Sequence, residues 1–258
     1  MPDGKPSRYI TPEALLKLRF GEQARPRWDI GILCFRGQAG SQALVRKLGA
    51  RRVEAKTLYG FSESPGHAGV HEVTVGGRRI VVVSGCLWGG PQAAILVGEL
   101  ACLGARIVLG FGVAGSLVPE LPKGAQVVAA TGIVTDGTSR AYTSRDEVTA
   151  DARLAAALGA AAAGLGVPLT PVRIATVDAL YRETPDDVRG WLGRGARAIN
   201  METAPLYAAA TACEVASLWL GHISDSLSPD TAEWDSWHRP TAMTDVTVTL
   251  TAALLEQL

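Results

Sequence analysis

Two carboxylates stand where short apolar segments end, a position from which both could act on one ligand. Glu202 closes the segment ARAINME (196–202) and precedes the alanine-rich run TAPLYAAATA. Asp225 directly follows the apolar segment ASLWLGHIS (216–224). A carboxylate can hold sugar hydroxyls, and a carboxyl group at the edge of a dry pocket can donate a proton near neutral pH. Glu202 is therefore a candidate to bind a sugar, and Asp225 is a candidate proton donor.

Each carboxylate also has a purely structural interpretation. An acidic residue at the start of a helix interacts favourably with the helix dipole, and Pro205 fits the first turn of such a helix. On spacing alone, Glu202 could serve only this purpose. Asp225 could equally form an Asx turn or cap a helix N-terminus.

The elements that must position these residues alternate between strand and helix. Several of the apolar segments are apolar at consecutive residues, as strands covered on both faces are. Strands are expected at 29–35, 79–85, 106–115, 125–134, 171–177, 196–202 and 216–224, and helices at 40–49, 91–104, 150–166, 185–193, 203–214 and 241–257. This alternation predicts an α/β fold with a central mixed, largely parallel sheet flanked by helices. The polar stretch 224–240 is expected to be a lid near a site or a surface loop.

Composition excludes several classes of function. The 258 residues carry 25 basic and 25 acidic side chains, and no basic stripe is present, so we expect no nucleic-acid partner. No segment predicts a membrane span, and the polar N-terminus does not resemble a signal peptide. No linker divides residues 1–258, which are expected to form one cytoplasmic domain with free thiols at its four cysteines.

Ligands of open α/β sheets bind at the carboxyl ends of the strands, and three of these ends are glycine-rich or polar. They are SGCLWGGP (84–91), GFGVAGS (110–116) and HISDS (222–226). Neither a dinucleotide fingerprint nor a P-loop accompanies them, so no cofactor is expected. The four histidines show no metal-ligand pattern, and we expect no metal.

Five segments, in order, resemble the hexameric nucleoside phosphorylase family, and its uridine phosphorylase branch most closely. They are SRYITPEALLKL, LWGGPQAAILVGELACLGARIVLGFGVAGSL, GAQVVAATGIVTDGTSRAY, TVDALYRETPDDVRGWLGRGARAIN and METAPLYAAA. Members of this family cleave the glycosidic bond of a nucleoside with phosphate. The resemblance implies that Glu202 accepts hydrogen bonds from the ribose hydroxyls, with Met201 against the sugar.

The resemblance also implies residues for the base. Tyr181, Leu180 and Ser224 would lie near it, and Asp225 stands where purine-cleaving members carry the acid that protonates the base. Pyrimidine-cleaving members have an asparagine there and a Gln-x-Arg pair that this chain lacks. We therefore expect a purine or related base.

The phosphate-binding arginines of the family are not reproduced. The first-strand loop is CFRGQAG (34–40), in which Arg36 is displaced, and a glycine, Gly110, replaces the second arginine. Val113 replaces a hydroxyl residue, and no arginine stands near His71, where the partner subunit's contribution is expected. Arg36, Trp88, Gly89, Gly110 and Val113 would line the anion or nucleophile pocket. Without fixed cations a dianion is poorly held, so phosphate is a possible but doubtful co-substrate.

Three functions follow from these residues. The first is a nucleoside phosphorylase-like or nucleosidase-like enzyme, with water favoured as the nucleophile. The second is a phosphorylase scaffold recruited to another reaction in specialised metabolism. This function is suggested by Trp88, because its bulky indole would fill the anion space. The third is a non-catalytic nucleoside-binding protein. The resemblance implies that each site is built by a pair of subunits and that these pairs assemble into hexamers. A homo-oligomer, a dimer or a trimer of dimers, is therefore expected, with Tyr9 and His71 as candidates for the neighbouring site.

Overall fold

The fold is a long mixed sheet with helices on both faces. The computed structural model describes residues 8–21, 25–54, 56–64, 68–231, 233–236 and 241–258. Its helices are α1 (Pro12–Phe20), α2 (Gln38–Leu48), α3 (Gly90–Cys102), α4 (Gly137–Tyr142), α5 (Ala152–Gly164), α6 (Pro185–Gly193), α7 (Thr203–Ala212) and α8 (Thr241–Gln257), with a 3-10 turn η1 (Leu180–Arg182). Its strands are β1 (Ile30–Cys34), β2 (Arg51–Arg52), β3 (Gly69–Val75), β4 (Arg78–Ser84), β5 (Ile107–Ser116), β6 (Gln126–Val134), β7 (Glu147–Thr149), β8 (Leu169–Thr176), β9 (Ala198–Asn200), β10 (Ala216–Ser228) and β11 (Glu233–Asp235).

Five strands of the sheet close on one another. Strand β5 pairs with β10 and β9, β10 pairs with β6, and β8 joins β6 to β9, so that the pairings form a ring. The pairs β1–β4, β1–β5, β5–β10, β6–β8 and β8–β9 are parallel. This architecture confirms the predicted single α/β domain with a mixed, largely parallel sheet.

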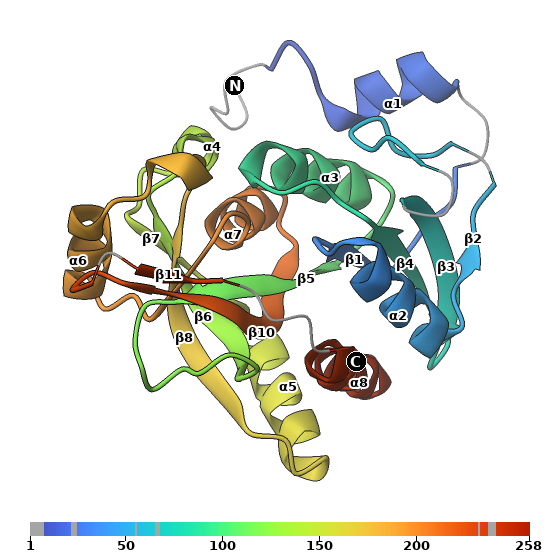
Figure 1. Cartoon of the computed structure of the whole chain (residues 1–258). Coiled ribbons are helices and arrows are strands. Elements are labelled where there is room, and N and C mark those ends of the chain that lie inside the picture. The colour runs from blue at the N-terminus through green and yellow to red at the C-terminus, as the bar shows by residue number, and fades with distance from the viewer. Residues whose placement is uncertain (1–7, 22–24, 55, 65–67, 232, 237–240) are drawn as a thin grey trace.

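Two helical layers cover the sheet. Helices α3 and α7 pack against each other on one face, and α2, α5 and α8 lie on the opposite face (Figure 1). All five residues of β1 are buried because both faces of that strand are covered. The N-termini of α3 and α7 follow the carboxyl ends of β4 and β9, and this arrangement places Gly89 and Glu202 at one edge of the sheet.

Local patterns predicted most elements closely, and the main difference concerns residues 224–240. Helices 185–193 and 241–257 have the predicted bounds. Strand β10, however, continues to Ser228, and β11 pairs with it antiparallel, so much of the expected lid or loop is a β-hairpin. Residues 237–240 lie outside the described part of the chain. None of the described helices combines the length and apolarity that a membrane span requires.

Candidate active site

Glu202 is a buried carboxylate at the junction of two helix N-termini. Its side chain is 4% exposed, and Oε1 accepts a hydrogen bond from the backbone N–H of Gly89 at 3.1 Å. Gly89 precedes α3 and adopts a φ of 106°, a left-handed conformation that favours glycine. A Cβ on the next residue, Gly90, would lie 3.0 Å from Pro205 of α7, so the two helix starts are in close contact.

The pKa of Glu202 reflects the balance between burial and these donors. Burial raises it to about 7, while the backbone N–H groups of Gly89 and Met201 act in the opposite direction. The positive ends of the α3 and α7 dipoles also favour the ionised form. At neutral pH the site can therefore hold a dry anion that accepts hydroxyl protons, as a sugar-binding carboxylate must.

Glu202 stands at the N-cap position of α7, but the side chain that accepts from the first helical N–H is that of Asn200. The side chain of Glu202 makes no capping hydrogen bond. Asn200 Oδ1 instead accepts from the N–H of Thr203 at 3.2 Å, and its Nδ2 donates to Thr203 Oγ1 at 2.8 Å. Thr176, at the end of β8, accepts from the N–H of Ala204. Asn200 thus leaves Glu202 free to face Gly89.

Asp225 lies in β10 just beyond a bulge between Ile223 and Asp225. Its Oδ1 accepts from Ser224 Oγ at 2.5 Å, and its Oδ2 accepts from Trp234 Nε1 at 2.9 Å. Asp225 therefore neither caps a helix nor forms an Asx turn, and the hairpin strand β11 supplies one of its donors. Sequence reasoning missed Trp234 as a specific contact, although it marked the stretch that contains it.

The two predicted acids flank the end of one strand without touching. Gly115 of β5 pairs with Asp225 on one side and with Ile199 of β9 on the other, three residues before Glu202. Strands β10 and β9, which lie on either side of β5, are therefore separated by two strand spacings, or roughly 10 Å. Met201 packs with Ile199 and Leu227 in one apolar cluster, and a Cβ on Gly115 would approach Ile199 and Asp225 Oδ2 at 3.1 and 3.3 Å. Met201 and Asp225 thus share one side of the β5 terminus, and Glu202 faces α3 on the other.

The residues predicted to contact the base lie in and near η1. Leu180 is 44% exposed and Tyr181 is 95% exposed, so both project freely. Glu183 follows this turn and is half-buried. Burial, the charge of Asp225 and that of Asp187 raise the pKa of Glu183 to about 7. This charge effect places Glu183 within electrostatic range of Asp225, and Glu183 is a candidate residue that sequence reasoning did not identify.

Gly110 cannot line a pocket, because an indole covers it. A Cβ at this position would lie 2.6 Å from Cδ1 of Trp219 and 2.9 Å from Cδ2 of Leu206. Trp219 stands directly opposite Gly110 in the β5–β10 register and is fully buried. A side chain at 110, arginine included, has no space while this indole is present.

Arg36 is directed to the opposite face of the sheet from Glu202. Its Nη2 donates to Thr244 Oγ1 of α8 at 2.8 Å, and burial lowers its pKa. The neighbouring α2 and α8 belong to the layer remote from α3 and α7. The structure therefore does not bring Arg36 and Gly110 together, and the anion pocket expected from them is not formed by these side chains.

The remaining predicted residues lie at the surface or in strands. Trp88 is 62% exposed, so its indole does not fill an interior anion space, which removes the motive for the recruited-scaffold function. Val113 is half-buried on β5, opposite His222. Tyr9 is fully exposed, and His71 of β3 lies 3.4 Å from Ser84 Oγ. Their predicted part in a neighbouring subunit's site stays a prediction.

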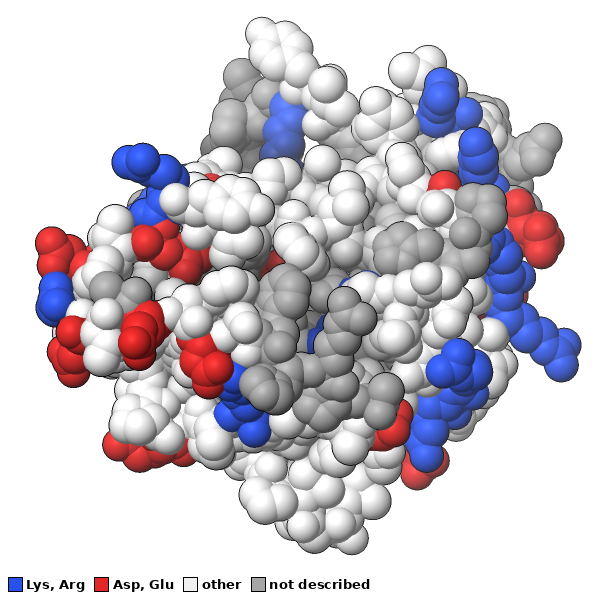
Figure 2. All heavy atoms as spheres, viewed as in Figure 1, with Lys and Arg blue, Asp and Glu red and all other residues white. Residues whose placement is uncertain are grey.

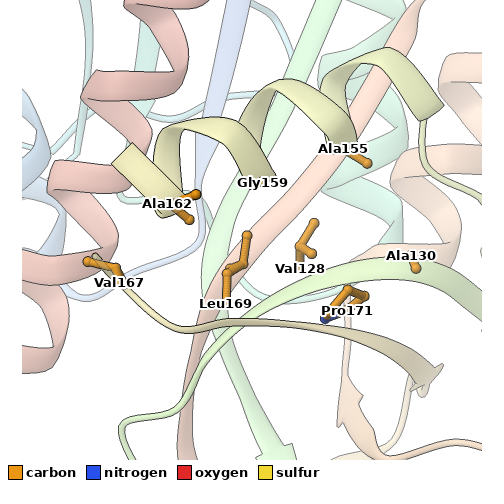
Figure 3. A pocket seen from close by; sticks show the side chains of 9 residues that line it. Val128, Ala130, Ala155, Gly159, Ala162, Val167, Leu169 and Pro171 are labelled. Atoms are coloured by element: carbon orange, nitrogen blue, oxygen red, sulfur yellow. The ribbon is translucent and has the colours of Figure 1, made fainter. Parts of the chain in front are cut away.

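A shallow apolar hollow lies away from both carboxylates. It has a volume of about 310 Å³ and lies between α5 and strands β6 and β8 (Figure 3). Alanine, glycine, valine, leucine and proline residues line it, so it offers no group for acid, base or nucleophilic chemistry. Within the described residues, no group of three or more histidine, cysteine, aspartate or glutamate side chains could hold a metal ion.

Several curated proteins with similar sequences are nucleoside phosphorylases. A DeoD-type purine nucleoside phosphorylase of Thermoanaerobacter sp. (strain X514) is 30% identical over 204 residues, covering 78% of this chain and 82% of that protein. A uridine phosphorylase of Thermococcus kodakarensis is 30% identical over 175 residues, covering 63% of this chain and 61% of that protein. The chain spans 61% of the length of two of the curated relatives it matches.

The fold is also that of solved nucleosidases. The 5′-methylthioadenosine/S-adenosyl homocysteine nucleosidase of Campylobacter jejuni is 18% identical, with a TM-score of 0.71 over 90% of this chain and all of that one. The family model described as the phosphorylase superfamily matches residues 29–258. This match includes every strand of the sheet and both candidate acids, and the chain accordingly belongs to the phosphorylase superfamily.

Proposed function

We propose that the protein cleaves the N-glycosidic bond of a purine nucleoside, or one with a related base, with water as the nucleophile. The observation that carries this proposal is the burial of Glu202 between the N-termini of α3 and α7 in a member of the phosphorylase superfamily. In that position Glu202 holds the pentose hydroxyls. It also stabilises the positive charge that develops on the sugar as the bond breaks.

The residues around the carboxyl end of β5 support a proposed elongated site with two ends. Met201 and Glu202 stand at the pentose end, and Asp225, Ser224 and Tyr181 stand at the base end. A nucleoside lying across the carboxyl end of β5 would meet both. The leaving base needs a proton or a hydrogen bond, and the carboxyl groups of the base end supply it.

Water is favoured over phosphate because position 110 carries no cation and the guanidinium of Arg36 is directed away from this edge of the sheet. Trp219 occupies the space above Gly110, and Arg36 donates to Thr244 on the other face. Charge-assisted bonds to arginine provide most of the binding free energy for a phosphate dianion. A water molecule requires only hydrogen bonds and fits the same edge of the sheet.

The test is base release from purine and pyrimidine nucleosides, measured by chromatography with and without inorganic phosphate. We expect free purine base and free pentose at rates that phosphate does not change. Glu202→Gln, which keeps an acceptor for the Gly89 N–H, is the matched inactive control. Formation of pentose 1-phosphate would show phosphorolysis instead. Nucleoside binding without release from any substrate would favour the non-catalytic function.

A homo-oligomer in the cytoplasm is part of the same proposal. Tyr9 and His71 would then reach the site of the neighbouring copy. Sedimentation velocity of the purified chain tests the assembly, and a monomer with full activity would contradict it.

A further inference from the structure

The turn that presents the N–H of Gly89 to Glu202 is tied down by the side chain of Gln92. This turn, residues 85–89, joins β4 to α3, and Gln92 is the third residue of α3. Gln92 Oε1 accepts a hydrogen bond from the backbone N–H of Leu87, in the middle of the turn. The side chain of Gln92 therefore links the turn to the first turn of the helix.

This hydrogen bond differs from that of a capping box. In a capping box, the side chain at the third helical position accepts from the backbone N–H of the N-cap residue. The N-cap residue of α3 is Gly89. Because Gln92 accepts from Leu87 instead, the N–H of Gly89 stays available, and it donates to Glu202 Oε1 at 3.1 Å. The partner that Gln92 takes therefore decides which acceptor the N–H of Gly89 can reach.

The nitrogen of the Gln92 amide is bound by a neighbouring strap, residues 57–61. Gln92 Nε2 donates to the carbonyl oxygen of Gly60 at 3.1 Å. The strap lies directly against α3, because a Cβ on Gly60 would collide with Ile95. Glu99, further along the same helix, accepts from the N–H groups of Tyr59 and Gly60 at 3.0 and 2.9 Å. With its oxygen and its nitrogen both bonded, the amide of Gln92 is held in one orientation.

Neutral groups hold the turn, and no ion pair is needed. Glu99 is the one charged residue in the sequence of α3, and the surface over this helix is largely white in Figure 2. Burial and the backbone N–H groups of Gly89 and Met201 set the pKa of Glu202. Burial raises the pKa of the Cys86 thiol, in the same turn, well above its usual range, so this thiol stays neutral at pH 9. A change in the pKa of Glu202 therefore reports on its backbone donors.

We propose that Gln92 is a positioning residue of the candidate active site, which aims the N–H of Gly89 at the carboxylate of Glu202. Its consequence for catalysis rests on the proposed function, in which ionised Glu202 holds the pentose. A hydrogen bond weakens steeply when donor and acceptor are misaligned, and a bond to the ionised form stabilises that form. Without the amide of Gln92 the turn loses this alignment, and Glu202 keeps its proton to higher pH.

The test is the pH dependence of kcat/KM for base release by Gln92→Met, which keeps a long side chain and removes both hydrogen bonds. We expect the acid limb of the wild-type profile, near pH 7, to move up by about one unit. The variant should then be about tenfold slower at pH 6 and within about twofold of the wild type at pH 9, where Glu202 is ionised in both proteins. Gln92→Asn, whose shorter side chain cannot reach both partners, should show the same shift.

Ile95→Ala is the matched control, because Ile95 lies on the same helix against the same strap but has no polar atom to offer the turn. We expect this variant to lower the midpoint of urea denaturation and to leave the acid limb in place. A rate that falls by the same factor at every pH in Gln92→Met would indicate a loss of folded protein and overturn the inference. An equal shift of the limb in Ile95→Ala would also overturn it.

A measurement without turnover separates this inference from the proposed function. In a carbon NMR titration of the glutamate carboxyl groups, the signal that Glu202→Gln lacks identifies Glu202. We expect its midpoint to be about one unit higher in Gln92→Met than in the wild-type protein. Equal midpoints would overturn the role of Gln92, whatever the activity. A shifted midpoint in a protein that releases no base from any nucleoside would overturn the proposed function and support the role of Gln92.

Discussion

Glu202 and Glu183 are both carboxylates whose pKa is raised to about 7, yet different structures hold them. Glu202 is enclosed by two helix starts and receives a backbone N–H. Glu183 is half-buried beside a hairpin and faces other carboxylates. The first environment is built to carry a charge without water, and the second to retain a proton. Similar proton affinities can therefore serve opposite tasks, and the neighbours of each group decide which task it has.

The strongest test of this contrast is Glu202→Gln, which removes the charge at the pentose end. We expect kcat/KM for base release to fall by about 10²–10³-fold, the range seen when one stabilising group is lost from a transition state. The wild-type rate should also fall below about pH 7, as Glu202 gains a proton. Steady-state kinetics across pH measures both effects, and a variant within threefold of the wild type would exclude Glu202 from the reaction.

The same substitution also tests the environment of Glu202 through the pH dependence of protein stability. The folded-state pKa of Glu202, about 7, lies above the ordinary value of 4.5 for a glutamate. The folded protein therefore binds more protons than the unfolded chain between these values, and the free energy of unfolding falls as the pH rises through this window. Deprotonation of Glu202 should lower the free energy of unfolding of the wild-type protein by about 3 kcal/mol. The Glu202→Gln protein should show no such loss. Urea denaturation at pH 5 and pH 8 measures the difference, and parallel curves for the two proteins would contradict it.

Glu99 is a third carboxylate with a raised pKa, and it lies outside the candidate site. It is almost fully buried on α3, its pKa is raised to about 7 by burial, and its two oxygens accept from the N–H groups of Tyr59 and Gly60. Glu99→Gln leaves one of these N–H groups facing an amide NH₂. We expect a loss of about 1–3 kcal/mol in the free energy of unfolding at pH 5. Glu202→Gln should lose less free energy of unfolding in the same measurement, because its side chain must accept from only one N–H, that of Gly89.

The smallest effect is expected at the base end from Trp234→Phe. This change removes the indole N–H that binds Asp225 Oδ2 and keeps an aromatic ring. Because one exposed hydrogen bond contributes about 1 kcal/mol, kcat/KM should change by about fivefold. Trp191→Phe, which alters an indole of α6 that makes no hydrogen bond to Asp225, is the control. Equal effects of the two substitutions would deny Trp234 a specific role.

Sequence patterns predicted what depends on neighbours along the chain. The helix at 185–193 was predictable because Pro185 and the acidic residues of its first turn mark its start, and the strands because they are apolar on both faces. Helix α1 and strand β3 were not predicted, since α1 buries only Leu16 and β3 is partly exposed. The extension of β10 depends on pairing with β11, which no local pattern reveals.

The site shows the same division between local and long-range information. Glu202 was identifiable as a lone carboxylate in apolar surroundings. Its partner Gly89 is 113 residues away, and the capping role of Asn200 became visible only in three dimensions. Glu183 carries no signal in its own segment, because its proton affinity arises from burial and from Asp225 on another element.

The packing of Trp219 restricts the order of substitutions by which an arginine could arise at position 110. Its indole lies over three glycines, 110, 112 and 221, each of which would place an added Cβ within 3.0 Å of it. An arginine gained first at 110 would collide with the ring, and a small residue gained first at 219 would leave a void in the core. Each single step therefore destabilises the core, so a descendant of this chain would reach an arginine at 110 only through an impaired intermediate or by two simultaneous substitutions.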